Sequence, residues 1–535
     1  MQDPQHLSAD VLVIGAGGAG MYAALEAARR GASVILADRS LIGRGGATVM
    51  AQMTVAVALD DEAADHWEHH YADTLRAGRG LCDPALAQLL CEEGPARIRE
   101  MDAWGVGWAR EAGRIKRAQA PGHDRPRCVY VDFLNTGPAV SKTLRARLNA
   151  TPEIRRVGDL HVTSLAVRDG QCVGALALHL PSGNTVRLAA KATIIATGGL
   201  TRLYQRNSAS LNMAGDGYAL AHAAGAELVD MEFVQFFPIG HLAPRLIGMD
   251  PIMWDPFRYK LGGRLLNGAR EEFLHKYGGV DDGKYVATRD LATYAIVKEA
   301  AAGRGSPHGG AWLSFEHCSE AELRAAGGPV IDRLAANGID LTRQAIEVAP
   351  IAHYHMGGVK VDERMATRVP GLFAAGEAVG GANGANRLSG NAITEALVFG
   401  ARSGESAALF SKKIQSMPEH TLGLEGGSAS SFNAAERIES LQATMQQDVG
   451  PFRTEAGLAR ALEHIEALRR ELESSRPPAG KRFDTALLDW LDLDTMTRVA
   501  GVVARAARAR TESRGAHQRE DFPAVDSRWE RSQVV

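Results

Sequence analysis

Residues 11–20 read Val-Leu-Val-Ile-Gly-Ala-Gly-Gly-Ala-Gly, an apolar run that leads directly into a glycine-rich turn. A fully apolar run of this length is typical of a buried parallel strand. The pattern of residues 21–30 predicts a helix, and residues 32–37 form a second apolar run that ends at Asp38. Strand, glycine turn, helix, second strand and acidic residue together predict a βαβ unit that binds a dinucleotide.

The glycines of this turn have separate expected tasks. Gly15 makes the turn, Gly17 lets the backbone approach a pyrophosphate, and Gly20 lets the helix pack closely on the strand. The pyrophosphate is expected at the helix N-terminus, where free N–H groups and the helix dipole favour negative charge. Asp38 can accept hydrogen bonds from a ribose. The alternative is a glycine turn with a purely structural role.

Later segments predict further strands of the same sheet. Residues 192–196 are apolar and run into Thr197, and residues 371–377 form a strand that ends at Gly376 and Glu377. Strands that end in small residues near a cofactor are typical of the carboxyl edge of a doubly wound sheet. The expected fold is α/β, with a Rossmann-like cofactor-binding domain, an inserted α+β capping domain and a C-terminal helical bundle. The predicted boundaries are 1–230 and 346–410 for the two parts of the cofactor-binding domain, 231–345 for the capping domain and 425–535 for the helical domain, with helical periodicity over 433–475 and 484–512.

Composition excludes several classes of protein. The 535 residues include 60 Lys+Arg and 63 Asp+Glu, a formal net charge of -3, whereas nucleic-acid binding usually needs a clear basic excess. The five cysteines form no CxxC pair, which argues against a haem attachment or a cysteine-paired iron–sulfur or zinc site in this chain. No apolar run approaches the ~18–20 residues of a membrane span, and the N-terminus lacks leader features. We therefore expect a soluble, cytoplasmic protein.

The residues with the strongest chemical signal lie between positions 349 and 391. His353 and His355 stand two residues apart, so an extended strand places them on opposite faces, one toward a cleft and one into packing. A zinc site is a weak alternative, because no Cys or Glu stands nearby at ligand spacing. Arg387 lies between Asn386 and Ser389, which suits bidentate binding of a carboxylate. The alternative is an ordinary arginine of a surface loop.

Several motifs carry a family resemblance. The chain resembles the succinate dehydrogenase/fumarate reductase/L-aspartate oxidase flavoprotein family over nearly its whole length. That resemblance implies FAD as the cofactor and hydride transfer between flavin N5 and a substrate carbon next to a carboxylate or similar activating group. It also implies a small organic acid as substrate, and it allows an iron–sulfur or other electron-transfer partner. The matching segments are residues 16–20, 212–217, 353–358, 370–377, 383–391 and 512–523.

The resemblance also assigns roles to individual residues. His353 and Arg387 match the substrate-carboxylate ligands, and Arg258 aligns with the arginine that transfers the proton, with Tyr259 as the substitute acid/base candidate. Substrate contacts are assigned to Phe237, Trp254 and His355. The predicted cofactor-binding residues are Gly15, Gly17, Gly18, Ala19, Gly20, Asp38, Arg39, Gly45, Ala47, Thr48, Gln52, Thr197, Gly198, Asp216, Glu377, Ser389 and Asn391.

Departures from the family pattern bear on the substrate. Ala47 stands where the membrane-complex members attach FAD through a histidine, so we expect non-covalent FAD. Phe237 replaces a substrate-contacting histidine, and Trp254 and Asp255 replace the threonine and glutamate that hold a distal carboxylate. A carboxylate buried there without partners would cost several kcal/mol, so succinate and fumarate are not expected as substrates. The alternative is that Arg258, Tyr259, Lys260 or His241 takes over the missing role.

Two other functions remain open at this point. One is an amino-acid oxidase that resembles L-aspartate oxidase. The other is a flavoprotein subunit that passes electrons to an iron–sulfur partner.

Overall fold

A computed structural model describes residues 5–59, 65–132, 134–246, 253–278, 289–424, 427 and 432–535; the side chains of residues 255, 256, 259, 289 and 290 lie outside that description. The chain divides into two compact units. Unit 1 comprises Met1–Gln205, Ala209–Val234 and Tyr354–Val535. Unit 2 comprises Arg206–Ser208 and Gln235–His353.

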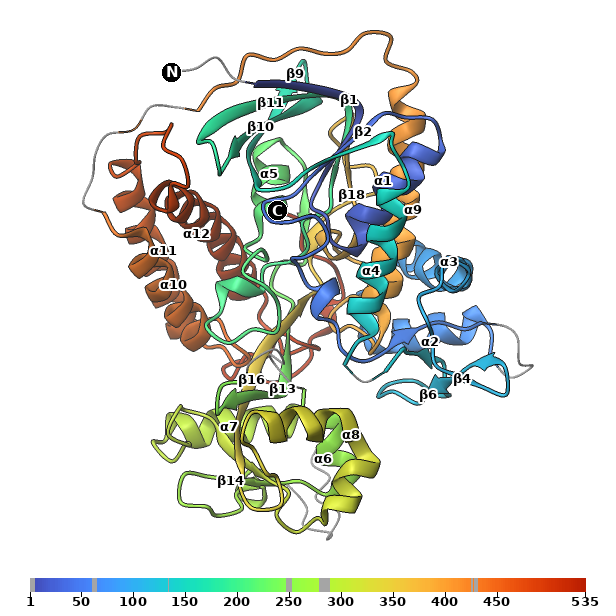
Figure 1. The fold of residues 1–535 in the computed structure, drawn as a ribbon. Coiled ribbons are helices and arrows are strands. Elements are labelled where there is room, and N and C mark those ends of the chain that lie inside the picture. Colours follow the sequence, from blue (N-terminus) through green and yellow to red (C-terminus); the bar gives the residue numbers. More distant parts are fainter. Residues whose placement is uncertain are drawn as a thin grey trace. The chain divides into compact units, whose positions relative to one another are not determined.

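Unit 1 is built on a seven-stranded sheet (Figure 1) with the strand order β8-β2-β1-β11-β10-β9, in which β18 also pairs with β11. The strands β8, β2, β1, β11 and β18 run parallel, whereas β10 pairs antiparallel with β11 and β9. All four residues of β2 and the last four residues of β1 are buried, as expected for strands covered on both faces. The bounds are β1 Gln5–Ile14, β2 Val34–Ala37, β8 Ile154–Val157, β9 Leu160–Arg168, β10 Gln171–His179, β11 Asn184–Ile195 and β18 Leu372–Ala374.

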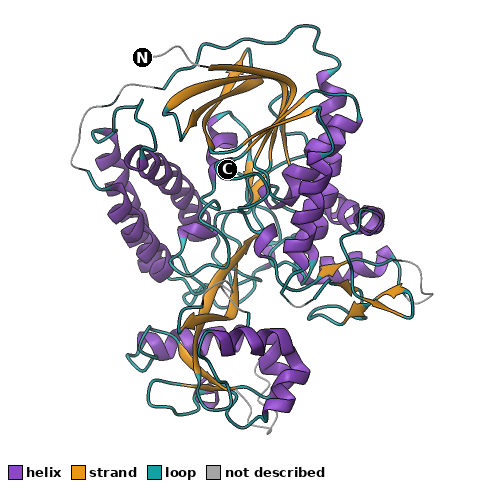
Figure 2. Cartoon of the chain, in the orientation of Figure 1, coloured by secondary structure: helices purple, strands orange, loops and turns teal. Residues whose placement is uncertain are grey.

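Helices α1 (Gly18–Arg29) and α9 (Asn391–Ser411) run side by side in unit 1 (Figures 1 and 2). Small residues permit this approach: a Cβ on Gly400 would lie 2.6 Å from the Ala19 carbonyl oxygen, and a Cβ on Gly404 would lie 2.3 Å from that of Ala23. The glycines of α9 therefore bring the helix that follows the 383–390 loop directly against the helix that follows the glycine turn. The other helices of this region are α2 Trp67–Ala77, α3 Pro84–Ala103, α4 Thr136–Asn149 and α5 Asp216–Ala223.

The C-terminal part of unit 1 is a bundle of α10 (Ala434–Asp448), α11 (Glu455–Glu473) and α12 (Thr485–Ala509). Each helix begins after a residue whose side chain accepts a backbone N–H hydrogen bond, namely Asn433, Thr454 and Asp484, the usual N-cap arrangement. The expected helical stretch 433–475 is thus two helices. The chain then ends in backbone hydrogen bonds between Val535 and Leu228, at 2.9 and 3.0 Å.

Unit 2 combines a four-stranded sheet, in the order β13-β16-β15-β14, with the α-helices α6, α7 and α8 among its described residues. Helix α8 begins at a capping box formed by Ser319 and Glu322. The predicted α/β fold with an inserted α+β region and a C-terminal helical bundle is confirmed. The bounds are β13 Val234–Ala243, β14 Arg264–Leu266, β15 Ala311–Ser314, β16 Ile346–His355, α6 Asp255–Leu261, α7 Arg289–Ala301 and α8 Glu320–Ala336.

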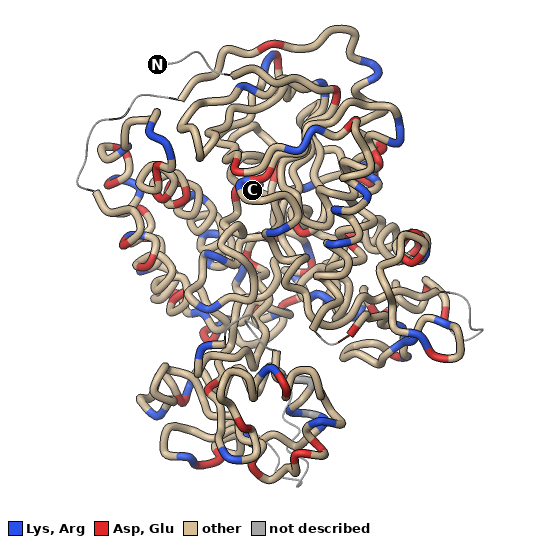
Figure 3. The backbone as a smooth tube through the Cα atoms, in the orientation of Figure 1, with Lys and Arg blue, Asp and Glu red and all other residues tan. Residues whose placement is uncertain are grey.

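Basic and acidic residues are both spread along the chain in each of the two units (Figure 3). This mixture agrees with the near balance of the sequence, 60 basic against 63 acidic residues. Among the helices that the structure describes, none is both long and apolar enough to cross a membrane.

Candidate functional site

The carboxyl ends of four parallel strands of unit 1 carry predicted cofactor residues. Gly15 follows β1, Asp38 follows β2, Thr197 lies just beyond β11, and Glu377 lies just beyond β18. Because these strands are parallel neighbours in one sheet, their carboxyl ends share one edge. Ligands of open α/β sheets bind outside that edge.

The glycine turn between β1 and α1 has the geometry of a phosphate-binding turn. Gly15 has a φ of +103°, which favours glycine. A Cβ on Gly20 would lie 1.8 Å from the Gly15 carbonyl oxygen, so only glycine lets the helix approach the turn. A Cβ on Gly17, by contrast, would meet only Thr48 Oγ1 at 3.8 Å. Gly17 therefore presents an open face, as the backbone beside a pyrophosphate must.

Asp38 holds this turn in place from the neighbouring strand. Its Oδ2 accepts a hydrogen bond from the Ala16 N–H at 2.6 Å, and its Oδ1 accepts from the Ser40 N–H and hydroxyl, both at 2.8 Å. Burial raises the pKa of Asp38 above its usual value, although these three donors oppose the rise. The carboxylate thus positions the glycine turn, besides the ribose contact that the sequence predicts for it.

The same edge of unit 1 offers polar groups suited to a ligand. Thr197 Oγ1 and Asp216 Oδ1 are buried and have no hydrogen-bond partner among the described residues. Orphaned buried polar atoms are rare in folded proteins. Together with the open face of Gly17, they fit a bound dinucleotide. The other predicted cofactor residues lie on the α1 N-terminus (Gly18, Ala19), after β2 (Arg39), before, in and after a short 3₁₀ helix at Thr48–Met50 (Gly45, Ala47, Thr48, Gln52), after β11 (Gly198) and around the start of α9 (Ser389, Asn391).

Arg39 belongs to a cluster of ion pairs rather than to an open site. Its guanidinium bonds to Asp216 Oδ2 at 3.1 Å and to Asp492 Oδ1 at 2.7 Å, and Arg202 also pairs with Asp492. His161, Asp216 and Asp492 bring potential metal ligands within 4.8 Å of one another. Because two guanidinium groups already neutralise the carboxylates, this arrangement suits an ion-pair network better than a cation.

His353 of unit 2 is held by two neighbours. Ser208 Oγ lies 2.7 Å from His353 Nδ1, and the Phe237 ring meets the His353 ring edge-on, with centroids 5.7 Å apart. The residue that replaces the family's histidine thus packs against the predicted substrate ligand. Sequence reasoning did not identify Ser208, which is distant in the chain and lies in a polar stretch without a distinctive pattern.

Trp254 is an internal residue of unit 2 with 1% of its surface exposed. Its indole N–H donates to His241 Nδ1 at 3.2 Å, and His241 Nε2 lies 2.6 Å from the Pro244 carbonyl oxygen. Because an indole nitrogen can only donate, Nδ1 of His241 is the acceptor and Nε2 carries the proton. Both ring nitrogens of His241 are therefore engaged, which argues against His241 as a substitute ligand for a second carboxylate.

Arg258 lies on α6 and has none of its surface exposed. Its backbone N–H donates to the Trp254 carbonyl at 2.9 Å, so the helix begins at the tryptophan that opens the altered segment. Tyr259 is on the same helix, but its side chain lies outside the described residues. The proton-transfer roles of both residues stay predictions.

Arg387 of unit 1 is 9% exposed and stacks over the Tyr354 ring, with its guanidinium carbon 4.5 Å from the ring centroid. The Tyr354 hydroxyl donates to Glu395 Oε2 at 2.6 Å, and the Asn383 amide donates to the same oxygen at 2.6 Å. Sequence reasoning identified Arg387 but missed Tyr354 and Glu395. A signal for Glu395 was present, since it is an acid within the apolar run 392–399.

His355 is fully buried in unit 1. Its Nδ1 lies 3.0 Å from the Tyr218 hydroxyl and its Nε2 lies 3.1 Å from the Met231 carbonyl oxygen. Burial lowers the pKa of His355 to about 4, so the ring is neutral. Its backbone N–H donates to Glu377 Oε1 at 3.1 Å, and burial raises the pKa of Glu377 to about 8. These contacts argue against the predicted substrate contact of His355 and indicate a packing role.

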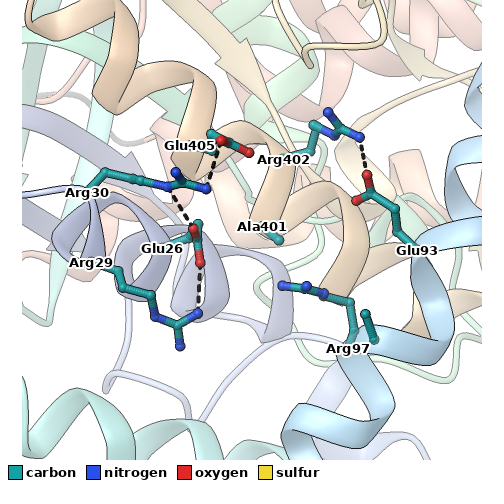
Figure 4. A pocket seen from close by; sticks show the side chains of 9 residues that line it. Glu26, Arg29, Arg30, Glu93, Arg97, Ala401, Arg402 and Glu405 are labelled. Carbon is teal, nitrogen blue, oxygen red and sulfur yellow. Dashed lines mark hydrogen bonds and ion pairs between the residues drawn. The ribbon is translucent and has the colours of Figure 1, made fainter.

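A cavity of about 610 Å³ lies among α1, α3 and α9 (Figure 4). Its charged side chains pair with one another: Arg30 bonds to Glu26 at 3.1 Å and to Glu405 at 2.7 Å, and Arg402 pairs with Glu93. Because these opposite charges satisfy each other, we assign the cavity to helix packing rather than to catalysis. The described lining is Glu26, Arg29, Arg30, Glu93, Ala96, Arg97, Ala401, Arg402 and Glu405.

Comparison with known proteins agrees with the geometry of unit 1. The family described as "FAD binding domain" matches residues 10–393, and the family described as "Fumarate reductase flavoprotein C-term" matches residues 438–535. The chain is 35% identical to a fumarate reductase (CoM/CoB) subunit of Methanothermobacter marburgensis, across 98% of this chain and 96% of that protein. It is 34% identical to the L-aspartate oxidase of Caulobacter vibrioides, across 96% and 94% of the two chains.

A solved structure extends the likeness to three dimensions. The structure of Mycobacterium smegmatis Sdh1 in complex with UQ1 superposes with a TM-score of 0.90 and 34% identity, and the match covers 98% of this chain and 91% of that one. The match to the FAD binding domain family confirms the expected cofactor, FAD. The chain belongs to the succinate dehydrogenase/fumarate reductase/L-aspartate oxidase flavoprotein family, and it is an FAD-dependent oxidoreductase.

Proposed function

We propose that this enzyme transfers hydride between FAD and a substrate carbon next to a single carboxylate or similar activating group, and that succinate and fumarate are not its substrates. The observation that carries this proposal is the contact between Phe237 and His353, with ring centroids 5.7 Å apart. A phenyl ring there cannot bond to a second carboxylate. An acid with one carboxylate and a more apolar body suits such a neighbour better.

The surroundings of Trp254 support the same conclusion. Its single polar group is already bonded to His241, and His241 is in turn bonded to the Pro244 carbonyl. To serve a distal carboxylate, either side chain would have to give up a buried hydrogen bond. Leaving a buried donor or acceptor without its partner costs about 1–3 kcal/mol. This cost is a physical reason to expect discrimination against diacids.

The remaining roles follow the family resemblance. FAD, when bound, supplies the hydride chemistry. His353 and Arg387 are proposed to bind and polarise the activating group, where negative charge develops during the reaction. Arg258 is the proposed group for proton transfer to the neighbouring carbon, with Tyr259 as the alternative. Because an arginine has a pKa above ~12 in water, this role requires that neighbouring groups help to relay the proton.

Two other functions are candidates. One is an electron-transferring component of a larger complex, and the other is an amino-acid oxidase. The 35%-identical relative is named as one subunit of an enzyme, and another relative is named L-aspartate oxidase. A flavoprotein subunit would pass its electrons to an iron–sulfur or other redox partner. Peroxide formation by the isolated chain with oxygen separates the two, because a chain that depends on a partner should form little.

The decisive experiment is anaerobic stopped-flow measurement of flavin reduction and reoxidation with a panel of small acids. We expect fumarate to reoxidise the reduced flavin far more slowly than an acid with one carboxylate next to the reacting bond. The variant Phe237→His should improve the rate with fumarate, while Arg387→Lys should weaken binding of every acid by about 1.5–3 kcal/mol. A wild-type kcat/KM for fumarate of ~10⁴ M⁻¹s⁻¹ or more would overturn the proposal.

A further inference from the structure

Glu395 is a fully buried acid in the second turn of α9. One of its carboxylate oxygens, Oε2, accepts both the Tyr354 hydroxyl and the Asn383 amide, each at 2.6 Å. The other oxygen, Oε1, has no hydrogen-bond partner among the described residues. A buried acid is costly unless it is hydrogen-bonded, so its presence among the buried residues of α9 calls for a reason other than packing.

The hydrogen bonds of Glu395 connect three segments of unit 1. Tyr354 lies near the end of β16, Asn383 lies early in the loop that contains Arg387, and Glu395 follows that loop on α9. The loop is also tied at its far end, where the Asn391 amide donates to Asn383 Oδ1 at 3.4 Å. The one oxygen of Glu395 thus connects a strand, the loop and the helix.

Arg387 stacks on Tyr354, the residue whose hydroxyl is bonded to Glu395. Its guanidinium carbon lies 4.5 Å from the centroid of the Tyr354 ring, within the range of an attractive cation–π contact. The bond from the Tyr354 hydroxyl to Glu395 fixes the position of the outer end of the ring, and with it the direction of the Tyr354 side chain. An arginine side chain loses up to about 2 kcal/mol of rotamer freedom when it is ordered, and a fixed platform offsets part of that cost before a ligand arrives.

We propose that Glu395 and Tyr354 are positioning residues that hold the Arg387 guanidinium in the orientation that binds the substrate carboxylate. This inference rests on the proposed function only in taking Arg387 as the carboxylate ligand. Glu395 acts through Tyr354 and does not touch the substrate.

The test uses FAD-loaded full-length protein with three variants and one control. Glu395→Ala removes the acceptor of both hydrogen bonds. Glu395→Gln keeps it, because the amide oxygen can occupy the Oε2 position and the NH₂ group the position of the unpartnered oxygen. Tyr354→Leu removes the platform itself. The control Glu405→Ala truncates another glutamate of α9, which pairs with Arg30 far along the helix.

Two measurements are made on each protein: a crystal structure, and titration of the flavin absorbance spectrum with acetate and with benzoate. In Glu395→Ala and Tyr354→Leu we expect a displaced or multiply placed Arg387 side chain and roughly tenfold weaker benzoate binding. Glu395→Gln and Glu405→Ala should match the wild type within about twofold, with unchanged FAD content.

An unmoved Arg387 with wild-type affinity in folded Glu395→Ala or Tyr354→Leu overturns the inference. If Glu395→Ala does not fold, Tyr354→Leu and the behaviour of Glu395→Gln still decide. If the wild-type spectrum responds to neither acid, the assignment of Arg387 to a carboxylate fails, and with it the proposed function. The crystal structures then still show whether Glu395 and Tyr354 position Arg387.

Discussion

Substitution of alanine for Gly17 separates the cofactor role of the glycine turn from its packing role. Gly17 has φ −72° and ψ −171°, a conformation that alanine adopts without strain. Its new Cβ would meet only Thr48 Oγ1 at 3.8 Å, an ordinary contact. Gly20→Ala is the matched control, because its Cβ would lie 1.8 Å from the Gly15 carbonyl oxygen.

The two variants should have different free energies of unfolding. Apo Gly17→Ala should be as stable as the wild type or more stable by about 0.4–1 kcal/mol, because alanine restricts the unfolded chain. Gly20→Ala should lose about 1–3 kcal/mol or more through overpacking. With FAD at a hundredfold excess over its Kd, the wild type gains about 2.7 kcal/mol, and a Kd weakened a hundredfold would cut that gain to about 0.4 kcal/mol.

The assay is thermal and urea unfolding of each apoprotein with and without added FAD, together with flavin content per chain. Gly17→Ala should unfold like the wild type without FAD and respond little to it. Gly20→Ala should be weakened under both conditions. The reasoning is refuted if Gly17→Ala retains FAD at the wild-type stoichiometry and gains the same stability, because the pyrophosphate would then not lie against Gly17.

Three further outcomes can be checked. Arg510→Ala should lose roughly 3–5 kcal/mol in urea unfolding, because it leaves Glu232 and Glu512, bonded to Arg510 at 2.5 and 3.0 Å, buried without that guanidinium; a loss below ~1 kcal/mol would contradict this. Burial raises the pKa of Glu395 from 4.5 to about 7, so the folded state holds the carboxyl proton more tightly than the unfolded state does. The contribution of Glu395 to the free energy of unfolding therefore falls as the pH rises from about 4.5 to about 7. Glu395→Gln should accordingly gain stability relative to the wild type between pH ~5 and ~8. Acid precipitation should release FAD into the supernatant, because Ala47 cannot bond to it; flavin retained by the pellet would show covalent attachment.

The local pattern of residues 11–38 was sufficient to predict the cofactor-binding edge. Alternation of apolar runs and glycines is a short-range signal, and the observed α1 and β2 follow it within a few residues. Strand β1 ends at Ile14 as predicted but begins earlier than the apolar run, at Gln5. The bundle was harder to read. The stretch 433–475 keeps its helical periodicity but is interrupted at 449–454, where Gly450 and Pro451 precede the N-cap Thr454. These residues are signals for the end of one helix and the start of the next, but a prediction based on periodicity alone does not take them into account.

The partners of the candidate site residues could not be predicted in the same way. Ser208 and His353 are 145 residues apart, and Tyr354 and Glu395 are 41 apart. No local pattern specifies such pairs, since they depend on how strands and loops return to one another. Sequence reasoning therefore identified His353 and Arg387 but not the residues that orient them.

The substituted positions of the predicted substrate site lie in a different unit from the cofactor residues. The altered positions, Phe237 and Trp254, both belong to unit 2, whereas the glycine turn and the strand ends that fit FAD belong to unit 1. The sequence analysis allowed for a neighbouring side chain that binds the second carboxylate in place of the replaced polar residues, and His241 was one of the candidates. With both of its ring nitrogens bonded to Trp254 and Pro244, that route requires a buried hydrogen bond to break. The residues that fit the cofactor are unchanged by the substitutions Phe237 and Trp254. We therefore expect these two substitutions to change which acid the enzyme binds and to leave its binding of FAD unaltered.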